Sequence, residues 1–115
     1  MEKDQDHFSY FIDSVEVTDS TNNHIRHVPL PPGVDFLILT TNYQTAGKGQ
    51  GTNKWESEKG KNLLFSIKCM PWQVKASEQF ILMQAVSLAI CKAIRNILNN
   101  KKDIKIKWPN DIYYK

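Results

Sequence analysis

The chain has 115 residues, of which 41% are hydrophobic and 23% are charged, and its formal net charge is +3. This composition is typical of one ordinary globular domain, and it excludes a disordered chain and gives little support to a nucleic-acid-binding surface. Residues 1–7 are polar and charged, so we expect a disordered tail and no signal peptide there. No apolar run approaches the ~20 residues of a membrane span, so we expect none.

The first half of the chain predicts two strands joined by a helix. Residues 8–17 alternate loosely between aromatic and β-branched side chains, which suits a strand. Asp19-Ser20-Thr21 offers helix N-caps, so we expect a short helix through about Arg26. Pro29-Leu-Pro-Pro-Gly33 breaks any regular element, and the apolar run over residues 36–41 predicts a buried strand.

The second half predicts a strand, one long helix and a hairpin. Residues 62–68 suit a strand, and residues 77–98 carry apolar side chains at helical spacing, which predicts a wide buried face. Asn99-Asn100 would end this helix in a left-handed turn. Ile104 then begins a half-buried strand, and a turn at Pro109-Asn110-Asp111 leads into another from Ile112. The pattern predicts an α+β fold with a mixed, mostly antiparallel sheet and packed helices.

Two cysteines, Cys69 and Cys91, lie in apolar stretches without metal-ligand spacing. They predict buried, reduced thiols and therefore a cytoplasmic protein.

The segment from Tyr43 to Trp55 has the most unusual composition in the chain. It contains three glycines, two lysines and several amide and hydroxyl side chains, so we expect neither helix nor strand. Glycines allow positive φ and close approach to a ligand, and successive free N–H groups beside cations form an anion-binding concavity. Composition alone equally allows a mobile surface loop.

Four segments in this order resemble the biotin protein ligases: Asp19-Ser-Thr-Asn22, Tyr43-Gln-Thr-Ala-Gly-Lys-Gly49, Lys54-Trp55 with Gly60-Lys-Asn-Leu63, and Lys107-Trp-Pro-Asn-Asp111. The resemblance runs from about Val15 to the last residue. It implies a fold like that of class II aminoacyl-tRNA synthetases and biotin ligases. It also implies that residues 1–115 form the N-terminal part of the catalytic domain, without its C-terminal part and the small C-terminal barrel.

The resemblance further implies a two-step reaction that uses ATP and Mg²⁺. Biotin is activated as biotinyl-5′-AMP and is then transferred to a lysine of a biotin carboxyl carrier protein or carboxylase subunit. The family's catalytic lysine lies beyond Lys115, so we expect this chain alone to be incomplete and inactive. We expect no DNA or membrane partner. An incomplete sheet would expose apolar surface, which favours pairing with a second copy.

The biotin-binding residues implied by the resemblance are Ser20, Thr21, Asn22, Gln44, Gly47, Lys48, Gly49 and Gln50. A urea needs hydrogen-bond donors and acceptors in a dry pocket, which short hydroxyl and amide side chains supply. Ser20 or Asp19 could instead only cap a helix, and Gln44 could be a surface amide at a sheet edge.

The residues implied for ATP and the adenylate are Lys48, Gln50, Trp55, Asn110 and Asp111. Lys48 and Asp111 are the catalytic candidates, and Asp111 is also the Mg²⁺ candidate. Trp55 could instead belong to the core, and Asn110-Asp111 could be a plain turn. The family usually has Arg at the positions of Lys48 and Gln50, so we expect this chain to hold the adenylate less tightly.

Two other functions stay open. A fragment without the catalytic lysine could bind biotin or nucleotide without catalysis. A lipoate-type or other acid-adenylating ligase could use the same scaffold.

Overall fold

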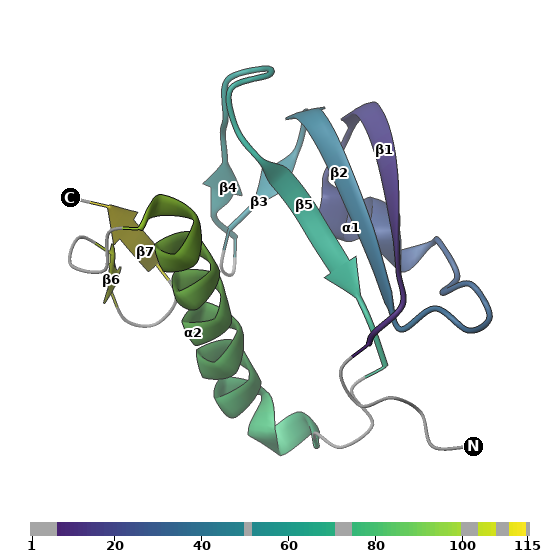
Figure 1. The fold of residues 1–115 in the computed structure, drawn as a ribbon. Coiled ribbons are helices and arrows are strands. Elements are labelled where there is room, and N and C mark those ends of the chain that lie inside the picture. Colours follow the sequence, from purple (N-terminus) through teal and green to yellow (C-terminus); the bar gives the residue numbers. More distant parts are fainter. Residues whose placement is uncertain (1–6, 50–51, 71–74, 100–103, 108–110, 115) are drawn as a thin grey trace. The chain divides into compact units, whose positions relative to one another are not determined.

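The computed structural model describes residues 7–49, 52–70, 75–99, 104–107 and 111–114 (Figure 1). Its internal contacts divide the chain into two compact units, Met1–Met70 and Pro71–Lys115. Each unit is described by itself below.

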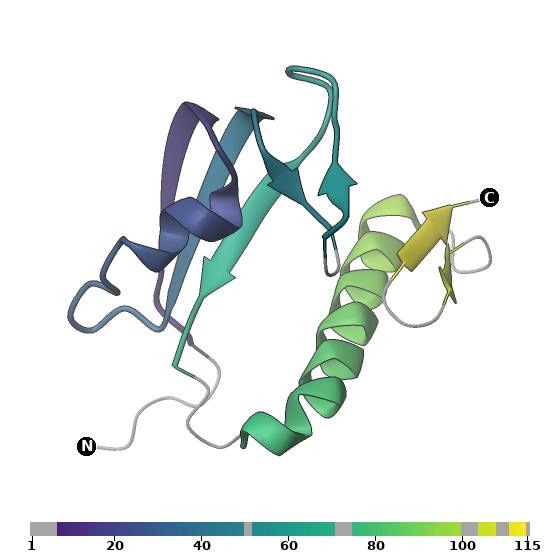
Figure 2. The ribbon, with the colours of Figure 1, turned by 180° about the vertical axis from the view of Figure 1, so that it is seen from behind.

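The first unit is built on a three-stranded sheet with the order β1-β2-β5. Its strands are β1 (Tyr10–Thr18), β2 (Phe36–Gln44) and β5 (Leu64–Lys68). β2 pairs with β1 in parallel and with β5 antiparallel. Parallel neighbours need a crossover connection, and here it carries the short helix α1 (Thr21–Arg26), which lies across one face of the sheet (Figure 2).

The core of this unit lies between α1 and the sheet. Leu37 and Leu39 alternate along β2, so both point to the same face, where they meet Ile25 of α1. All three side chains are buried, and the partly buried side chains that pack against them are Val15, Val28 and Leu30. The same packing holds the C-terminal end of α1 against the sheet.

Lys68, at the end of β5, also anchors the C-terminal end of α1. Its half-buried ammonium group donates hydrogen bonds to the carbonyl oxygens of Ile25, at 3.3 Å, and Val28, at 2.7 Å. The Ile25 carbonyl, in the last turn of α1, also accepts the backbone N–H of Val28 at 3.2 Å, so Lys68 adds a charged donor at the end of the helix that carries the negative end of the helix dipole. The sequence predicts residues 62–68 only as a strand and gives no signal for the contact of Lys68 with α1.

We expect Lys68→Met to destabilise the protein by roughly 1.5–3 kcal/mol, because two carbonyl oxygens lose a charged donor. The free energy of unfolding in urea, followed by far-UV circular dichroism, measures this effect. Lys61→Met is the matched control, since Lys61 makes only an exposed ion pair with Glu58 at 2.8 Å, a class of contact worth at most about 1 kcal/mol. Equal losses in the two variants would contradict an anchoring role for Lys68.

The glycine-rich segment is more ordered than its composition predicts. β2 continues through Tyr43 to Gln44, and two short strands follow, β3 (Gly47–Lys48) and β4 (Lys54–Trp55). β3 and β4 pair antiparallel, with Gly47 opposite Trp55 and Lys48 opposite Lys54. The expectation of neither helix nor strand is therefore wrong, because strand pairing outweighs the weak strand propensity of glycine. Gln50 and Gly51 lie outside the described residues.

The second unit contains the long helix and the hairpin that the sequence predicts. A 3-10 turn, η1 (Ala76–Glu78), leads into α2 (Gln79–Leu98), and Asn99 follows in the left-handed conformation with φ of 51°. β6 (Ile104–Lys107) and β7 (Asp111–Tyr114) pair antiparallel. Asp111 was predicted in the turn but is the first residue of β7, opposite Lys107. Trp108, Pro109 and Asn110 lie outside the described residues.

The predicted wide buried face of α2 is not present. Its only buried side chains are Ser87 and Cys91 among the described residues, and the exposed apolar ones include Phe80, Ile81, Val86, Leu88 and Ile97. The helical segment Ala76–Leu98 has 23 residues, and its most apolar 18-residue window has a mean hydropathy of 1.5. Length and composition therefore do allow a membrane span, contrary to the expectation from the sequence. Isolated polar residues interrupt the apolar run, but they do not lower the mean hydropathy of the window enough to exclude a span. One such helix is weak evidence, since core helices of soluble proteins share these properties.

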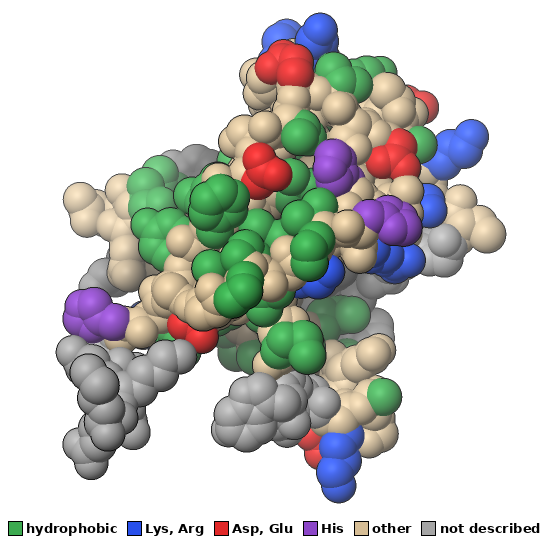
Figure 3. Space-filling model, turned by 90° about the vertical axis from the view of Figure 1, so that its right-hand side faces the viewer, with side chains coloured by type: hydrophobic (Ala, Val, Ile, Leu, Met, Phe, Trp, Pro, Cys, Tyr) green, Lys and Arg blue, Asp and Glu red, His purple; other side chains and the backbone are tan. Residues whose placement is uncertain are grey.

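One edge of the three-stranded sheet, formed by β1, carries exposed apolar side chains. β1 is an edge strand, and its exposed side chains include Tyr10, Phe11, Ile12 and Val17. Figure 3 shows apolar side chains gathered on the side of the molecule that carries β1. An exposed apolar edge strand is a surface that favours pairing with another strand.

Cys69 and Cys91 are both free thiols. Cys91 is buried as predicted, whereas Cys69 is only half-buried. The prediction of a buried thiol is therefore wrong for Cys69, which follows the last residue of β5.

Candidate functional site

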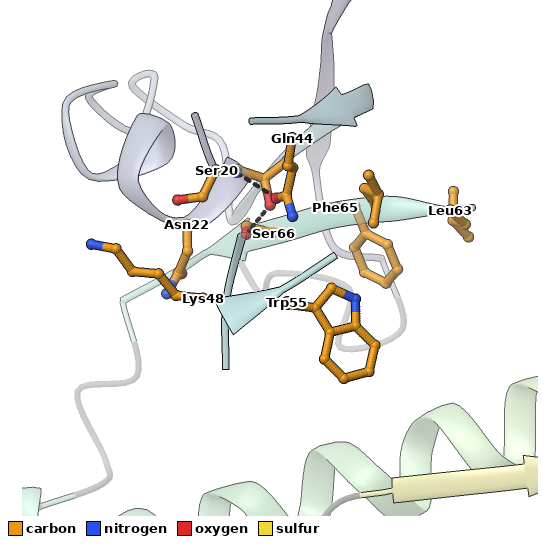
Figure 4. Close-up of a pocket in the computed structure, with 10 residues that line it drawn as sticks. Ser20, Asn22, Gln44, Lys48, Trp55, Leu63, Phe65 and Ser66 are labelled. Carbon is orange, nitrogen blue, oxygen red and sulfur yellow. Dashed lines mark hydrogen bonds between the residues drawn. The ribbon is translucent and has the colours of Figure 1, made fainter. Parts of the chain in front are cut away.

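A cavity of about 340 Å³ opens between the N-terminus of α1, the β3–β4 ribbon and β5 (Figure 4). Its lining residues come from segments far apart in the sequence: Ser20, Thr21, Asn22, Gln44, Lys48, Trp55, Leu63, Leu64, Phe65 and Ser66. All of them belong to the first unit. The cavity thus collects six residues that the sequence analysis selected from three separate motifs.

The N-terminus of α1 is held by a network around Ser20. The Ser20 hydroxyl accepts a hydrogen bond from the backbone N–H of Asn23 at 3.0 Å, which makes Ser20 the N-cap. The Asp19 carboxylate accepts bonds from the Ser20 backbone N–H, at 2.7 Å, and from the Asn23 side chain. These bonds, that of the Ser20 N–H first, lower the pKa of Asp19. Ser20 therefore caps the helix and lines the cavity at once.

Gln44 and Ser66 are both bound to Thr21. The Gln44 side-chain oxygen accepts a hydrogen bond from the Thr21 backbone N–H at 2.8 Å, and the hydroxyl groups of Thr21 and Ser66 share a bond of 2.7 Å (Figure 4). Gln44 is half-buried and fixed by this contact, so it is not a surface amide at a sheet edge. With its oxygen engaged, the amide keeps its NH₂ group as the available donor.

The two ends of the cavity differ in chemistry. Ser20, Asn22 and Lys48 lie on one side of it, and the rings of Trp55 and Phe65 lie on the other (Figure 4). Trp55 is 58% exposed, so it is not a core residue, the alternative considered from the sequence. A flat aromatic surface beside polar groups suits a ligand that is partly apolar and partly polar or charged.

Lys48 is the residue shared by this cavity and a second one. The second cavity, of about 300 Å³, is lined by Thr45, Ala46, Gly47, Lys48, Thr52, Asn53 and Lys54. Lys48 is exposed, so its ammonium group can serve an anion in either cavity without a buried-charge penalty. Lys54 lines only the second cavity.

The backbone of the glycine-rich segment does not offer the row of free N–H groups that the sequence predicts. The N–H groups of Thr45 and Ala46 bind the carbonyl oxygens of Thr18 and Asp19, at 3.0 and 2.7 Å, and the Gly49 N–H binds Asn53 at 2.7 Å. These three donors are occupied within the protein, so they are not available to an anion.

Gly47 is required for close approach rather than for positive φ. A Cβ atom on Gly47 would lie 2.3 Å from the carbonyl oxygen of Trp55 and 3.1 Å from the side-chain nitrogen of Gln44. Neither Gly47 nor Gly49 has positive φ, contrary to the expectation for this loop. Gly47 lines the second cavity, and Gly49 lines neither of the two.

The remaining predicted residues are not part of this cavity. Asp111 is exposed at the start of β7 in the second unit, and Gln50 and Asn110 lie outside the described residues. Within the described ranges, no group of three His, Cys, Asp or Glu side chains could hold a metal ion. A Mg²⁺ ion bound to ATP needs only one or two protein carboxylates, since phosphates and water fill its other positions, so Asp111 stays compatible with that ion.

Four lining residues are not among the predicted site residues, although Leu63 ends one of the quoted motifs: they are Leu63, Leu64, Phe65 and Ser66. They belong to or precede β5, which the sequence predicts only as a strand. Strand register places Ser66 opposite Leu39, and therefore on the face that carries α1. Side chains alternate between the two faces of β5, which separates Leu64 and Ser66 from Leu63 and Phe65. This alternation alone does not indicate which of the two faces carries α1.

The sequence matches the model of the biotin/lipoate A/B protein ligase family over residues 14–115. Among curated proteins, the chain is 34% identical over 101 residues to biotin–protein ligase 1, chloroplastic, of Arabidopsis thaliana, covering 82% of this chain and 26% of that protein. It is 33% identical over 101 residues to the bifunctional ligase/repressor BirA of Escherichia coli K12, covering 84% and 29%. The chain therefore spans about a quarter of the length of these relatives.

Solved structures agree with the sequence comparison. The fold is similar to that of biotin protein ligase from Leishmania major in complex with biotinyl-5-AMP, with a TM-score of 0.74, 27% identity and coverage of 90% of this chain and 47% of that chain. For the Aquifex aeolicus biotin protein ligase in complex with biotin and ATP, the TM-score is 0.68 at 27% identity, covering 90% and 41%. The predicted fold class is confirmed. The chain belongs to the biotin/lipoate A/B protein ligase family, as the resemblance of its motifs to the biotin protein ligases indicates.

Proposed function

We propose that this chain provides the biotin-binding part of an ATP-dependent biotin–protein ligase. The observation that carries the proposal is the single cavity that joins Ser20, Thr21, Asn22, Gln44, Lys48 and Trp55 from three separate motifs. Relatives that this chain resembles are named biotin–protein ligases, and the similar Leishmania major structure contains biotinyl-5-AMP.

In this proposal the hydroxyl and amide groups at the α1 end of the cavity bind the ureido ring of biotin. A urea offers two N–H donors and one carbonyl acceptor. A hydroxyl group can accept a hydrogen bond from such an N–H group or donate one to the carbonyl oxygen. Phe65 would contact the sulfur-containing ring and the aliphatic chain of biotin, and Trp55 would pack against the adenylate. Lys48 would then face the biotin carboxylate and the α-phosphate of ATP, two anions that repel each other unless a cation lies between them.

The chemical step would be attack of a biotin carboxylate oxygen on the α-phosphorus of ATP, with pyrophosphate leaving. The resulting biotinyl-5′-AMP would then lose AMP to the ε-amino group of a carrier lysine. Such a reaction needs positioning and charge neutralisation rather than a covalent enzyme intermediate. Asp111 would hold the Mg²⁺ that accompanies ATP, and Asn110 and Gln50 would bind phosphate or the adenylate.

The proposal includes a biotin carboxyl carrier protein or carboxylase subunit as the macromolecular partner, in the cytoplasm. It also includes the assignment of residues 1–115 to the N-terminal part of the ligase catalytic domain. The exposed apolar side chains of β1 support pairing with a second copy of the chain.

Biotin-dependent exchange of pyrophosphate into ATP tests the proposed activation step. We expect exchange when biotin, ATP and Mg²⁺ are all present with the residues that complete the catalytic domain, and none when biotin is omitted. Biotin binding by the 115-residue chain, measured by isothermal titration calorimetry, tests the binding part separately.

These two measurements separate the competing functions. Biotin binding without exchange in the complete domain would favour a non-catalytic binding protein. Exchange that depends on lipoate, and that biotin does not stimulate, would favour a lipoate-type ligase. The absence of both biotin binding and pyrophosphate exchange would contradict the proposal.

A further inference from the structure

Thr21 connects the three elements that surround the polar end of the cavity. It is the first residue of α1, its backbone N–H binds Gln44 of β2, and its hydroxyl binds Ser66 of β5. Thr21 is only 4% exposed, so water does not compete freely for these bonds. No sequence motif marked Ser66, although it lines the same cavity.

The Thr21–Ser66 contact leaves one hydroxyl hydrogen free. Each hydroxyl has one hydrogen and two acceptor lone pairs, and the shared bond of 2.7 Å uses a single hydrogen. When Ser66 donates, Thr21 keeps its hydrogen for a ligand, and when Thr21 donates, Ser66 keeps its own. The pair can therefore present a donor or an acceptor to a ligand while the Thr21 side chain stays fixed in one rotamer.

We propose that Ser66 is a positioning residue for recognition of the ureido ring, acting through Thr21. This inference rests on the proposed function, since it concerns the same cavity. Ser66 fixes the side chain of Thr21, and the Thr21 backbone fixes the amide of Gln44. Loss of the Ser66 hydroxyl releases the Thr21 rotamer and weakens binding even where Ser66 itself does not contact the ligand.

The test is a double-mutant cycle on biotin affinity, measured by isothermal titration calorimetry. We expect Ser66→Ala to weaken biotin binding about five- to tenfold, the range for one lost neutral hydrogen bond. In a Thr21→Val background the same change should weaken binding by less than about twofold, because no hydroxyl remains for Ser66 to hold. Thr21→Ala serves as a second background without a hydroxyl group at position 21. Competition titration extends the measurable range of biotin affinity to variants that bind weakly.

Ser14→Ala is the matched control. Ser14 and Thr40 form a similar hydroxyl pair of 2.8 Å between β1 and β2, and neither residue lines the cavity. This change should leave biotin affinity within about twofold of the original, since it removes a pair of the same kind remote from the ligand. A loss from Ser14→Ala as large as that from Ser66→Ala would point to general destabilisation and overturn the inference.

Two further results would overturn it. Unchanged affinity in Ser66→Ala would show that Thr21 needs no support, and an equal loss in both Thr21 backgrounds would show that Ser66 does not act through Thr21. Failure of the unsubstituted protein to bind biotin would refute the proposed function itself, and that result is obtained before any substitution is made.

Discussion

Replacing Lys48 with glutamine should lower kcat/KM for biotin-dependent pyrophosphate exchange roughly 10- to 150-fold, the effect of losing one charged hydrogen-bond donor to an anion. The expected loss is large because the backbone N–H groups of Thr45, Ala46 and Gly49 are already bound within the protein. Little else in the described part of the ribbon can replace the missing charge at the first cavity. Exchange rates at several biotin and ATP concentrations, measured on the complete catalytic domain, give this value.

Lys54→Gln is the matched control for this experiment. Lys54 is the register partner of Lys48 in β4, so the two substitutions remove the same charge from neighbouring positions. Lys54 does not line the first cavity, and its removal should change kcat/KM much less. Equal losses would mean that only the general electrostatic field of the ribbon matters. Lys48→Arg keeps the charge and should retain most of the activity.

A second large effect is expected for Gly47→Ala, through the shape of the cavity rather than through charge. The new Cβ would lie 2.3 Å from the Trp55 carbonyl oxygen, which is backbone and cannot rotate away. β3 and β4 must therefore separate, which displaces Lys48 and Trp55 together. Relieving a clash of this kind costs about 1–3 kcal/mol, so biotin affinity should fall roughly 5- to 150-fold. Isothermal titration calorimetry measures the change.

Gly49→Ala tests whether the effect belongs to that close contact. The nearest atom to a Cβ on Gly49 is the Cβ of Asn53 at 3.1 Å, in a side chain that can shift by a few tenths of an ångström. Both substitutions place a methyl group on the same ribbon, but only the first meets a carbonyl oxygen. A loss for Gly49→Ala that matches the loss for Gly47→Ala would contradict the proposed mechanism.

Local features of the fold were predictable from the sequence because they depend on neighbouring residues. Ser20 was expected as an N-cap and is one, α2 ends at Leu98 as its spacing indicates, and Asn99 is left-handed. The hairpin of β6 and β7 follows from a turn between two apolar alternations. The selection of Ser20, Thr21, Asn22, Gln44, Lys48 and Trp55 came from motif resemblance, and the structure brings these residues into one cavity.

Features that depend on long-range register were not predictable. The sequence does not indicate that the hydroxyl groups of Ser66 and Thr21 are hydrogen-bonded. Nor does it indicate that Lys68 donates hydrogen bonds to the carbonyl oxygens of Ile25 and Val28. The β3–β4 ribbon was missed because glycine has poor strand propensity, and pairing between strands overrides that preference. The exposed apolar side chains of α2 were missed because periodicity indicates a face to be covered but not what covers it.

The parallel pairing of β1 with β2 has a consequence for how the protein folds. The two strands can meet only after the chain between them has closed a loop, and the Thr21–Ser66 bond joins residues 45 positions apart. Contacts of such long range form slowly, since the entropy of loop closure is lost before they contribute any energy. We therefore expect the cavity to be completed late, when β5 docks beside β2. A bound ligand would therefore prolong the lifetime of the folded state and leave the speed of folding nearly unchanged.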